Sequence, residues 1–114
     1  MKMKLITAVV KPFTLSDVRD ALAAADIKGM TVTEVQGFGQ QQGHTEVYRG
    51  AEFTTEFVPK VKIEVVISDD KLQAAVNAIT SAAHTGKTGD GKIWVTNVEH
   101  VIRVRTGEQD NEAL

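Results

Sequence analysis

The stretch Val61-Lys62-Ile63-Glu64-Val65-Val66-Ile67 decides the fold of this chain. Apolar residues alternate with charged ones over most of its length, with the period of two that is typical of a β-strand with one buried face. Ser68, Asp69 and Asp70 follow directly and predict a helix N-cap with an acidic first turn. The next residues repeat at helical spacing and give one apolar face, made of Leu72, Ala75, Val76, Ile79, Ala82 and Ala83. This part of the chain therefore predicts a strand that leads into an amphipathic helix.

A second strand and helix precede this pair. Residues 5–10 form an apolar, mostly β-branched run that Lys11 and Pro12 end, which predicts a buried strand. Thr14, with Asp17 three residues later, predicts the capped start of a helix. Its apolar face consists of Leu15, Val18, Leu22 and Ala25.

Three further strands are predicted, at residues 30–35, 93–95 and 101–105. Between the two strand–helix pairs, residues 37–58 follow no single period, and so long an insertion in a compact domain is usually functional. The order is therefore β-α-β, long loop, β-α-β, which predicts a ferredoxin-like α+β sandwich in a single domain over residues 1–114. We expect the acidic tail, residues 108–114, to be mobile.

In such a sandwich both helices cover the same face of the sheet. We expect Thr33, Lys62 and Glu64, or their neighbours, on the other face. A sheet with one uncovered face needs a partner, which predicts a homo-oligomer.

The bulk composition excludes several function classes. A net charge of -2 gives the protein no excess of positive charge with which to bind nucleic acid. The absence of cysteine excludes disulfides, thiol catalysis and cysteine-based zinc sites. The N-terminal apolar run is too short for a signal peptide or a membrane span, so we expect a cytoplasmic protein.

The stretch Thr85-Gly-Lys-Thr-Gly-Asp-Gly-Lys-Ile-Trp94 carries most of the chemistry. It follows a predicted helix and leads into a strand, so it does not match a P-loop, but backbone N–H groups of a glycine-rich loop can still surround phosphate oxygens while Lys92 adds charge. Arg103 and Arg105 would leave the same face of a predicted strand and could share an anion. The alternatives are a solvated glycine turn and a solvated pair of edge-strand arginines.

Evidence for catalysis is weak. His44, His84 and His100 lack the spacing of a metal site, and Asp69 and Asp70 are better explained by helix-start electrostatics than by acid–base work. No serine has an adjacent base. We therefore expect no catalytic residue and no enzyme.

The chain closely resembles the PII nitrogen-signalling proteins from about residue 4 to residue 107. The matching motifs, in order, are Val-Lys-Pro-Phe (10–13), Gly-Met-Thr-Val-Thr-Glu-Val (29–35), Gly-Phe-Gly (37–39), Gly-His-Thr-Glu (43–46), Tyr-Arg-Gly-Ala-Glu (48–52), Pro-Lys-Val-Lys-Ile-Glu (59–64), Thr-Gly-Lys-x-Gly-Asp-Gly-Lys-Ile (85–93) and Val-Ile-Arg-Val-Arg-Thr-Gly (101–107). So many motifs at matching spacings make the resemblance very specific.

The resemblance implies a homotrimer with nucleotide sites in the clefts between subunits, where ATP and ADP compete and 2-oxoglutarate binds beside MgATP. The implied nucleotide-binding residues are Thr31, Gly37, Phe38, Gly39, Glu64, Thr85, Gly86, Gly89, Asp90, Gly91, Lys92, Arg103 and Arg105. Those implied for 2-oxoglutarate are Gly39, Gln41, Gln42, Gly43, Lys60 and Gly89, with Gln41 also helping to ligate Mg²⁺.

The resemblance also implies that residues 39–58 form the T-loop, the segment that reaches partner proteins. Its implied contact residues are Tyr48, Arg49, Gly50, Ala51, Glu52 and Phe53. The implied partners are an ammonium channel or another transporter, which would bring the protein to a membrane, and enzymes of nitrogen metabolism. The implied nucleotide loop spans about residues 84–92.

The T-loop departs from the family pattern at several positions. Phe53 stands where uridylylated members have the acceptor tyrosine, and Ala51 stands where some cyanobacterial members have a phosphorylated serine. Tyr48 matches a tyrosine that is not modified. Gln40 and Gln42 replace basic residues, which should weaken anion affinity.

These observations favour a non-enzymatic sensor that works through bound ligands. A specialised paralogue for a different transporter or enzyme, a slow nucleotide-hydrolysing domain and a purely structural trimer stay as alternatives.

Overall fold

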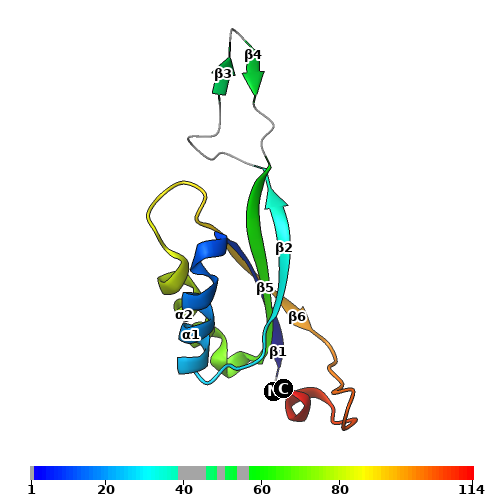
Figure 1. The fold of residues 1–114 in the computed structure, drawn as a ribbon. Coiled ribbons are helices and arrows are strands. Elements are labelled where there is room, and N and C mark those ends of the chain that lie inside the picture. The colour runs from blue at the N-terminus through cyan, green and yellow to red at the C-terminus, as the bar shows by residue number, and fades with distance from the viewer. Residues whose placement is uncertain (1, 39–45, 49–50, 54–56) are drawn as a thin grey trace.

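The fold was obtained as a computed structural model, which describes residues 2–38, 46–48, 51–53 and 57–114. Its centre is one four-stranded sheet made of β1 (Met3–Val10), β2 (Thr31–Gly37), β5 (Val58–Ser68) and β6 (Gly91–Val98). The strand order is β2-β5-β1-β6, and every neighbouring pair is antiparallel (Figure 1).

Two helices, α1 (Leu15–Ala24) and α2 (Leu72–Ala83), lie side by side over one face of this sheet (Figure 1). The chain order β1-α1-β2 and β5-α2-β6 confirms the predicted ferredoxin-like α+β sandwich. Alternate residues of β1 and β5 enter the core with the apolar stripes of the helices, and the largest fully buried side chains are Ile6, Val10, Val18, Leu22, Ile63 and Ile79.

Both helix starts differ from the sequence-based prediction. Short 3₁₀ turns, η1 (Pro12–Thr14) and η2 (Asp69–Lys71), precede α1 and α2. The Thr14 hydroxyl donates to the Lys11 carbonyl at 2.7 Å instead of capping the helix, and the Ser68 hydroxyl donates to Asp70. The predicted side-chain caps are therefore wrong, because the tight turns engage both hydroxyls locally.

The face of the sheet away from the helices carries Thr33, Lys62 and Glu64, as the alternation predicts. Two rows of side chains cross it. One row is Thr33, Lys62, Val9 and Lys92, and the next is Thr31, Glu64, Thr7 and Trp94. Trp94 is 46% exposed there, so a large aromatic ring lies open on this face.

The long loop begins where the ladder between β2 and β5 ends, at the pair Gly37 and Val58. The next residues on each side, Phe38 and Phe57, contact one another with ring centroids 5.6 Å apart at an angle of 49°. Within the loop the backbone forms a small hairpin of β3 (Glu46–Tyr48) and β4 (Ala51–Phe53).

The C-terminal residues 101–114 contradict one prediction. Residues 101–105 form no strand in the described structure, because their backbone makes only an isolated bridge, between Ile102 and Gln109. The tail ends in a 3₁₀ turn, η3 (Asp110–Ala113), and the Asp110 amide donates to the Val101 carbonyl at 2.7 Å. The acidic tail folds back through side-chain contacts that composition does not reveal.

Candidate anion-binding site

A cavity of about 740 Å³ lies at the end of the sheet where the long loop leaves it. It is lined by Val9, Gly37, Phe38, Lys60, Lys87, Gly89, Asp90, Gly91, Lys92 and Trp94. Four separate parts of the chain meet here: β1, the start of the long loop after β2, β5, and the glycine-rich loop with the β6 strand that follows it. Seven of these residues are among those that the sequence assigns to nucleotide or 2-oxoglutarate.

The glycine-rich loop takes a path that requires glycine. Gly86, Gly89 and Gly91 have φ angles of +84°, +95° and +107°, in the region that residues with a Cβ rarely adopt. At Gly91 a Cβ would also lie 1.8 Å from the Val9 carbonyl oxygen. The backbone therefore approaches β1 too closely for any side chain at this position.

Asp90 holds the loop together from inside. Its carboxylate accepts hydrogen bonds from the Thr85 amide at 2.7 Å, the Gly86 amide at 2.9 Å and the Thr85 hydroxyl. Lys11 adds an ion pair at 3.2 Å. The bonds from Thr85, first from its hydroxyl and then from its amide, hold the pKa of Asp90 well below the usual range, so the carboxylate is ionised at neutral pH.

Lys60 is a buried lysine, with 8% of its surface exposed. Its ammonium group donates to the Gly89 carbonyl, and its stem lies against Gly37, where a Cβ would stand 3.3 Å from Lys60 Cγ. Burial first, and then the positive charge of Lys11, lower the pKa of Lys60, while Asp90 acts in the opposite direction. An anion beside Lys60 would reverse this shift, because it would favour the charged ammonium.

The cavity carries an excess of positive charge. Lys60, Lys87 and Lys92 line it, and none of them forms an ion pair with a carboxylate among the described residues. Asp90 is the acidic residue of the lining, and its charge is already matched by Lys11. Cations without a counter-charge, next to a glycine-rich loop, favour an anionic ligand.

Arg103 and Arg105 do not line this cavity. The Arg103 guanidinium donates to Glu108 Oε1 at 2.9 Å and to the Leu114 carbonyl at 2.9 Å, and Arg105 is exposed on the adjacent turn. The expectation that the two arginines leave one face of a strand is wrong, because a turn closed by the bond from the Gly107 amide to the Arg103 carbonyl separates them.

Thr31 and Glu64 face one another across β2 and β5, in the row of side chains that ends at Trp94. They lie outside the cavity itself. Six of the remaining assignments, Gly39, Gln41, Gln42, Gly43, Arg49 and Gly50, lie outside the described residues, as does Gln40. Tyr48, Ala51, Glu52 and Phe53 are in the backbone of the hairpin.

Four residues of the site are absent from the sequence-based assignment: Val9, Lys11, Lys87 and Trp94. The pairing of Val10 with Gly91 brings Lys11 beside Asp90 and Val9 beside Lys92. Sequence spacing carries no sign of this register, whereas Lys87 and Trp94 stand within the glycine-rich stretch and could have been included.

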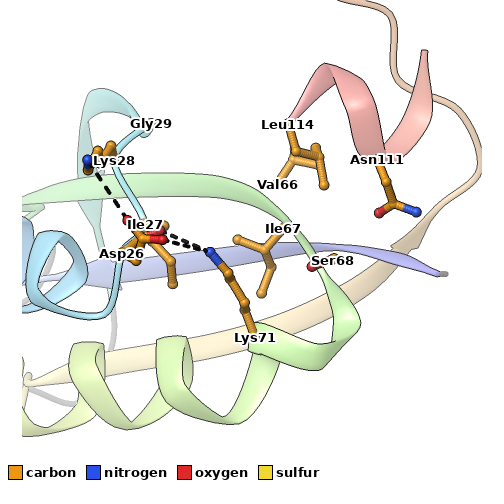
Figure 2. A pocket seen from close by; sticks show the side chains of 10 residues that line it. All are labelled: Asp26, Ile27, Lys28, Gly29, Val66, Ile67, Ser68, Lys71, Asn111 and Leu114. Carbon is orange, nitrogen blue, oxygen red and sulfur yellow. Dashed lines mark hydrogen bonds and ion pairs between the residues drawn. The ribbon is translucent and has the colours of Figure 1, made fainter. Parts of the chain in front are cut away.

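A second hollow, of about 620 Å³, lies at the opposite end of β5 (Figure 2). It also contains lysines, but Asp26 pairs with them (Figure 2). Lys71 Nζ lies 3.2 Å from the Asp26 carbonyl oxygen and 3.5 Å from Asp26 Oδ2, and Lys28 Nζ lies 3.9 Å from Asp26 Oδ1. Because the charges here are already paired, the cavity near Gly89 is the better candidate for an anion.

The described residues contain no group of three His, Asp or Glu side chains that could hold a metal ion. Over the same part of the chain, no helix combines the length and apolar character needed to cross a membrane.

Comparisons with known proteins agree with this architecture. The family model described as nitrogen regulatory protein P-II matches residues 3–108. Nitrogen regulatory protein GlnK of Escherichia coli K12 is 57% identical over 112 residues, covering 98% of this chain and all of the relative. Nitrogen regulatory protein P-II of Azospirillum brasilense is 58% identical with the same coverage. A crystal structure of Arabidopsis thaliana PII bound to citrate matches with a TM-score of 0.84 and 39% identity, over 99% of this chain and 92% of the other. The chain therefore belongs to the nitrogen regulatory protein P-II family.

Proposed function

We propose that this protein is a cytoplasmic, non-enzymatic regulator of nitrogen metabolism that binds ATP or ADP, together with Mg²⁺ and 2-oxoglutarate, and passes their state to partner proteins through its T-loop. The observation that carries the proposal is the lysine-lined cavity beside the glycine-rich loop. Lys60, Lys87 and Lys92 have no carboxylate partner among the described residues, so an anion would satisfy them.

The phosphates would be held by Gly89, Gly91 and Lys92. Backbone amides of a glycine-rich turn form an anion-binding concavity, and a lysine adds a point charge to it. The carboxylate ligand, 2-oxoglutarate, would be held by Lys60, the buried cation of the site. A related PII protein is described as bound to citrate, which is also a carboxylate. That observation supports an effector site for small carboxylates in this chain.

Arg103 and Arg105 would complete the nucleotide site of a neighbouring subunit in a homotrimer. Neither arginine lines the cavity of its own chain, which is compatible with that role. The uncovered face of the sheet, with Trp94 and Val66 exposed on it, supports self-association. Size-exclusion chromatography with light scattering tests the assembly: a mass near three times 12.4 kDa is expected, and a monomer would contradict it.

The T-loop would act without covalent modification, because Phe53 has no hydroxyl to accept a nucleotidyl group. Its partners would be an ammonium channel or another transporter, and enzymes of nitrogen metabolism. Gln40 and Gln42 favour a variant of this proposal, a paralogue dedicated to a different transporter or enzyme, because the charge at the T-loop base differs from that of other members.

Calorimetric titration tests the ligand assignment. We expect ATP and ADP to bind competitively, and 2-oxoglutarate to bind only when MgATP is present. Lys92→Met should weaken both nucleotides, and Lys28→Met, which changes a lysine of the other hollow, should leave them unchanged. Absence of binding at millimolar nucleotide would refute the proposal. Steady ATP hydrolysis that one carboxylate substitution abolishes would favour the hydrolase alternative.

A further inference from the structure

We infer that Lys11 is a positioning residue of this anion site: its ion pair with Asp90 fixes the shape of the glycine-rich loop and neutralises the one carboxylate in the cavity wall. The inference rests on the proposed function, because it explains how that loop is kept ready for an anionic ligand. It gives a role to Lys11, which the family resemblance does not assign to the site. It also gives a new role to Asp90, which the resemblance assigns to nucleotide binding.

Lys11 contacts both ends of the glycine-rich loop. It is the first residue after β1, and its ammonium nitrogen lies 3.2 Å from Asp90 Oδ1 and 3.3 Å from Thr85 Oγ1. The Lys11 and Asp90 side chains are 15% and 23% exposed, so solvent screens this pair less than it screens a surface ion pair. Lys11 therefore connects the loop to the central strand of the sheet.

The Asp90 carboxylate has no acceptor capacity left for a ligand. An ionised carboxylate has about four lone-pair positions. At Oδ1 the donors are the Thr85 hydroxyl and Lys11, and at Oδ2 they are the amides of Thr85 and Gly86. The side chain of Asp90 is therefore turned into the loop that it organises, and the ligand would meet the backbone of that loop.

The ion pair also sets the charge of the cavity. An Asp90 carboxylate without Lys11 would present a negative charge among Lys60, Lys87 and Lys92, where it would repel a phosphate. The other titratable groups facing Asp90 are His84, 3.8 Å away with a 71% exposed side chain, and Lys60. His84 lies farther from the Asp90 carboxylate than Lys11 does and is open to water, so Lys11 is the closer partner of Asp90.

The first test uses the protein without ligand. Lys11→Met keeps most of the stem and removes the charge, and Lys11→Arg keeps the charge. We expect the amides of Thr85 and Gly86 to exchange about tenfold faster in Lys11→Met and close to the wild-type rate in Lys11→Arg. The chemical shifts of these two amides should follow the titration of Asp90. The midpoint pH of that change should lie below the usual carboxyl range in the wild type and should rise in Lys11→Met.

The second test is affinity for ATP and ADP, measured by calorimetry on the same variants and followed by the fluorescence of Trp94, the single tryptophan. Lys11→Met should weaken ATP by about tenfold, with a smaller loss for ADP because it carries less charge. Adding Asp90→Asn to Lys11→Met should restore part of the ATP affinity, although the loop amides stay exposed to exchange. A merely structural role for Lys11 predicts no such recovery.

Unchanged amide exchange in Lys11→Met would overturn the inference. So would a loss of ATP affinity that Asp90→Asn leaves uncorrected, because Lys11 would then not act by neutralising Asp90. If the wild-type protein binds no nucleotide, the proposed function fails, and the exchange measurement alone still decides whether Lys11 holds the loop.

Discussion

Replacing Gly91 by alanine is expected to be among the most damaging single-methyl additions in this chain. The new Cβ would stand 1.8 Å from the Val9 carbonyl oxygen, 2.9 Å from the Val9 carbonyl carbon and 3.1 Å from Val10 Cα. All three atoms are backbone, so no side-chain rotation relieves the overlap. The start of β6 must move away from β1, and its first ladder pairs are lost.

The magnitude follows from two contributions. A φ of +107° costs a non-glycine residue about 1–2 kcal/mol. Losing two ladder hydrogen bonds adds roughly 2 kcal/mol, at about 1 kcal/mol each. The sum, about 3–4 kcal/mol, is a large share of the roughly 5–15 kcal/mol that stabilises a typical domain.

Two matched variants separate the contributions. Gly107 has a φ of +76° and open space around its Cβ position, so Gly107→Ala should cost only the conformational part, about 1–2 kcal/mol. Gly29 has open space and a φ outside the left-handed region, so Gly29→Ala should be close to neutral, within about 1 kcal/mol. Urea unfolding of all three, at one protein concentration, gives the free energies. A Gly91→Ala protein as stable as Gly107→Ala would refute the reasoning from close approach.

Three other outcomes are expected. Ile63→Ala, at a fully buried position of β5, should lower the free energy of unfolding by about 2–5 kcal/mol, and thermal unfolding that shows no change would contradict its place in the core. Because the pKa of Lys60 is lowered, 2-oxoglutarate affinity should fall as pH rises through that lowered value. The Lys60→Arg variant should stay charged over the same range. Calorimetry that gives equal affinity for the wild type from neutral to strongly alkaline pH would exclude Lys60 as the cation. Asp110→Asn should accelerate exchange of the Val101 amide, which donates to the Asp110 carboxylate at 3.2 Å, and unchanged exchange would show that the tail is held elsewhere.

The sequence alone was sufficient for the four strands of the sheet, the two helices and the position of the glycine-rich loop. Strands such as β5 and helices such as α2 are visible because their burial repeats with a fixed period. The loop is visible because its three positive-φ positions are all glycine.

Other parts of the structure depend on contacts that no local pattern records. Residues 101–105 alternate like a strand, but a strand needs a neighbour, and the described sheet ends at β6. The helix caps failed because a 3₁₀ turn engages the hydroxyl of Thr14 before α1 begins. Lys11 was not predicted as a site residue, because its role depends on the pairing of Val10 with Gly91, which lies eighty-one residues further along the chain.

The contact between Phe38 and Phe57 has a consequence for how this family can diversify. The two rings meet one residue beyond the last ladder pair, Gly37 and Val58, so the sheet and the aromatic pair together fix both ends of the long loop. The entropy of closing a loop rises only slowly with length, by about 0.6 kcal/mol for each doubling. The length of residues 39–56 can therefore change while the sheet and the two helices keep their stability, so variation in this segment requires no change of scaffold.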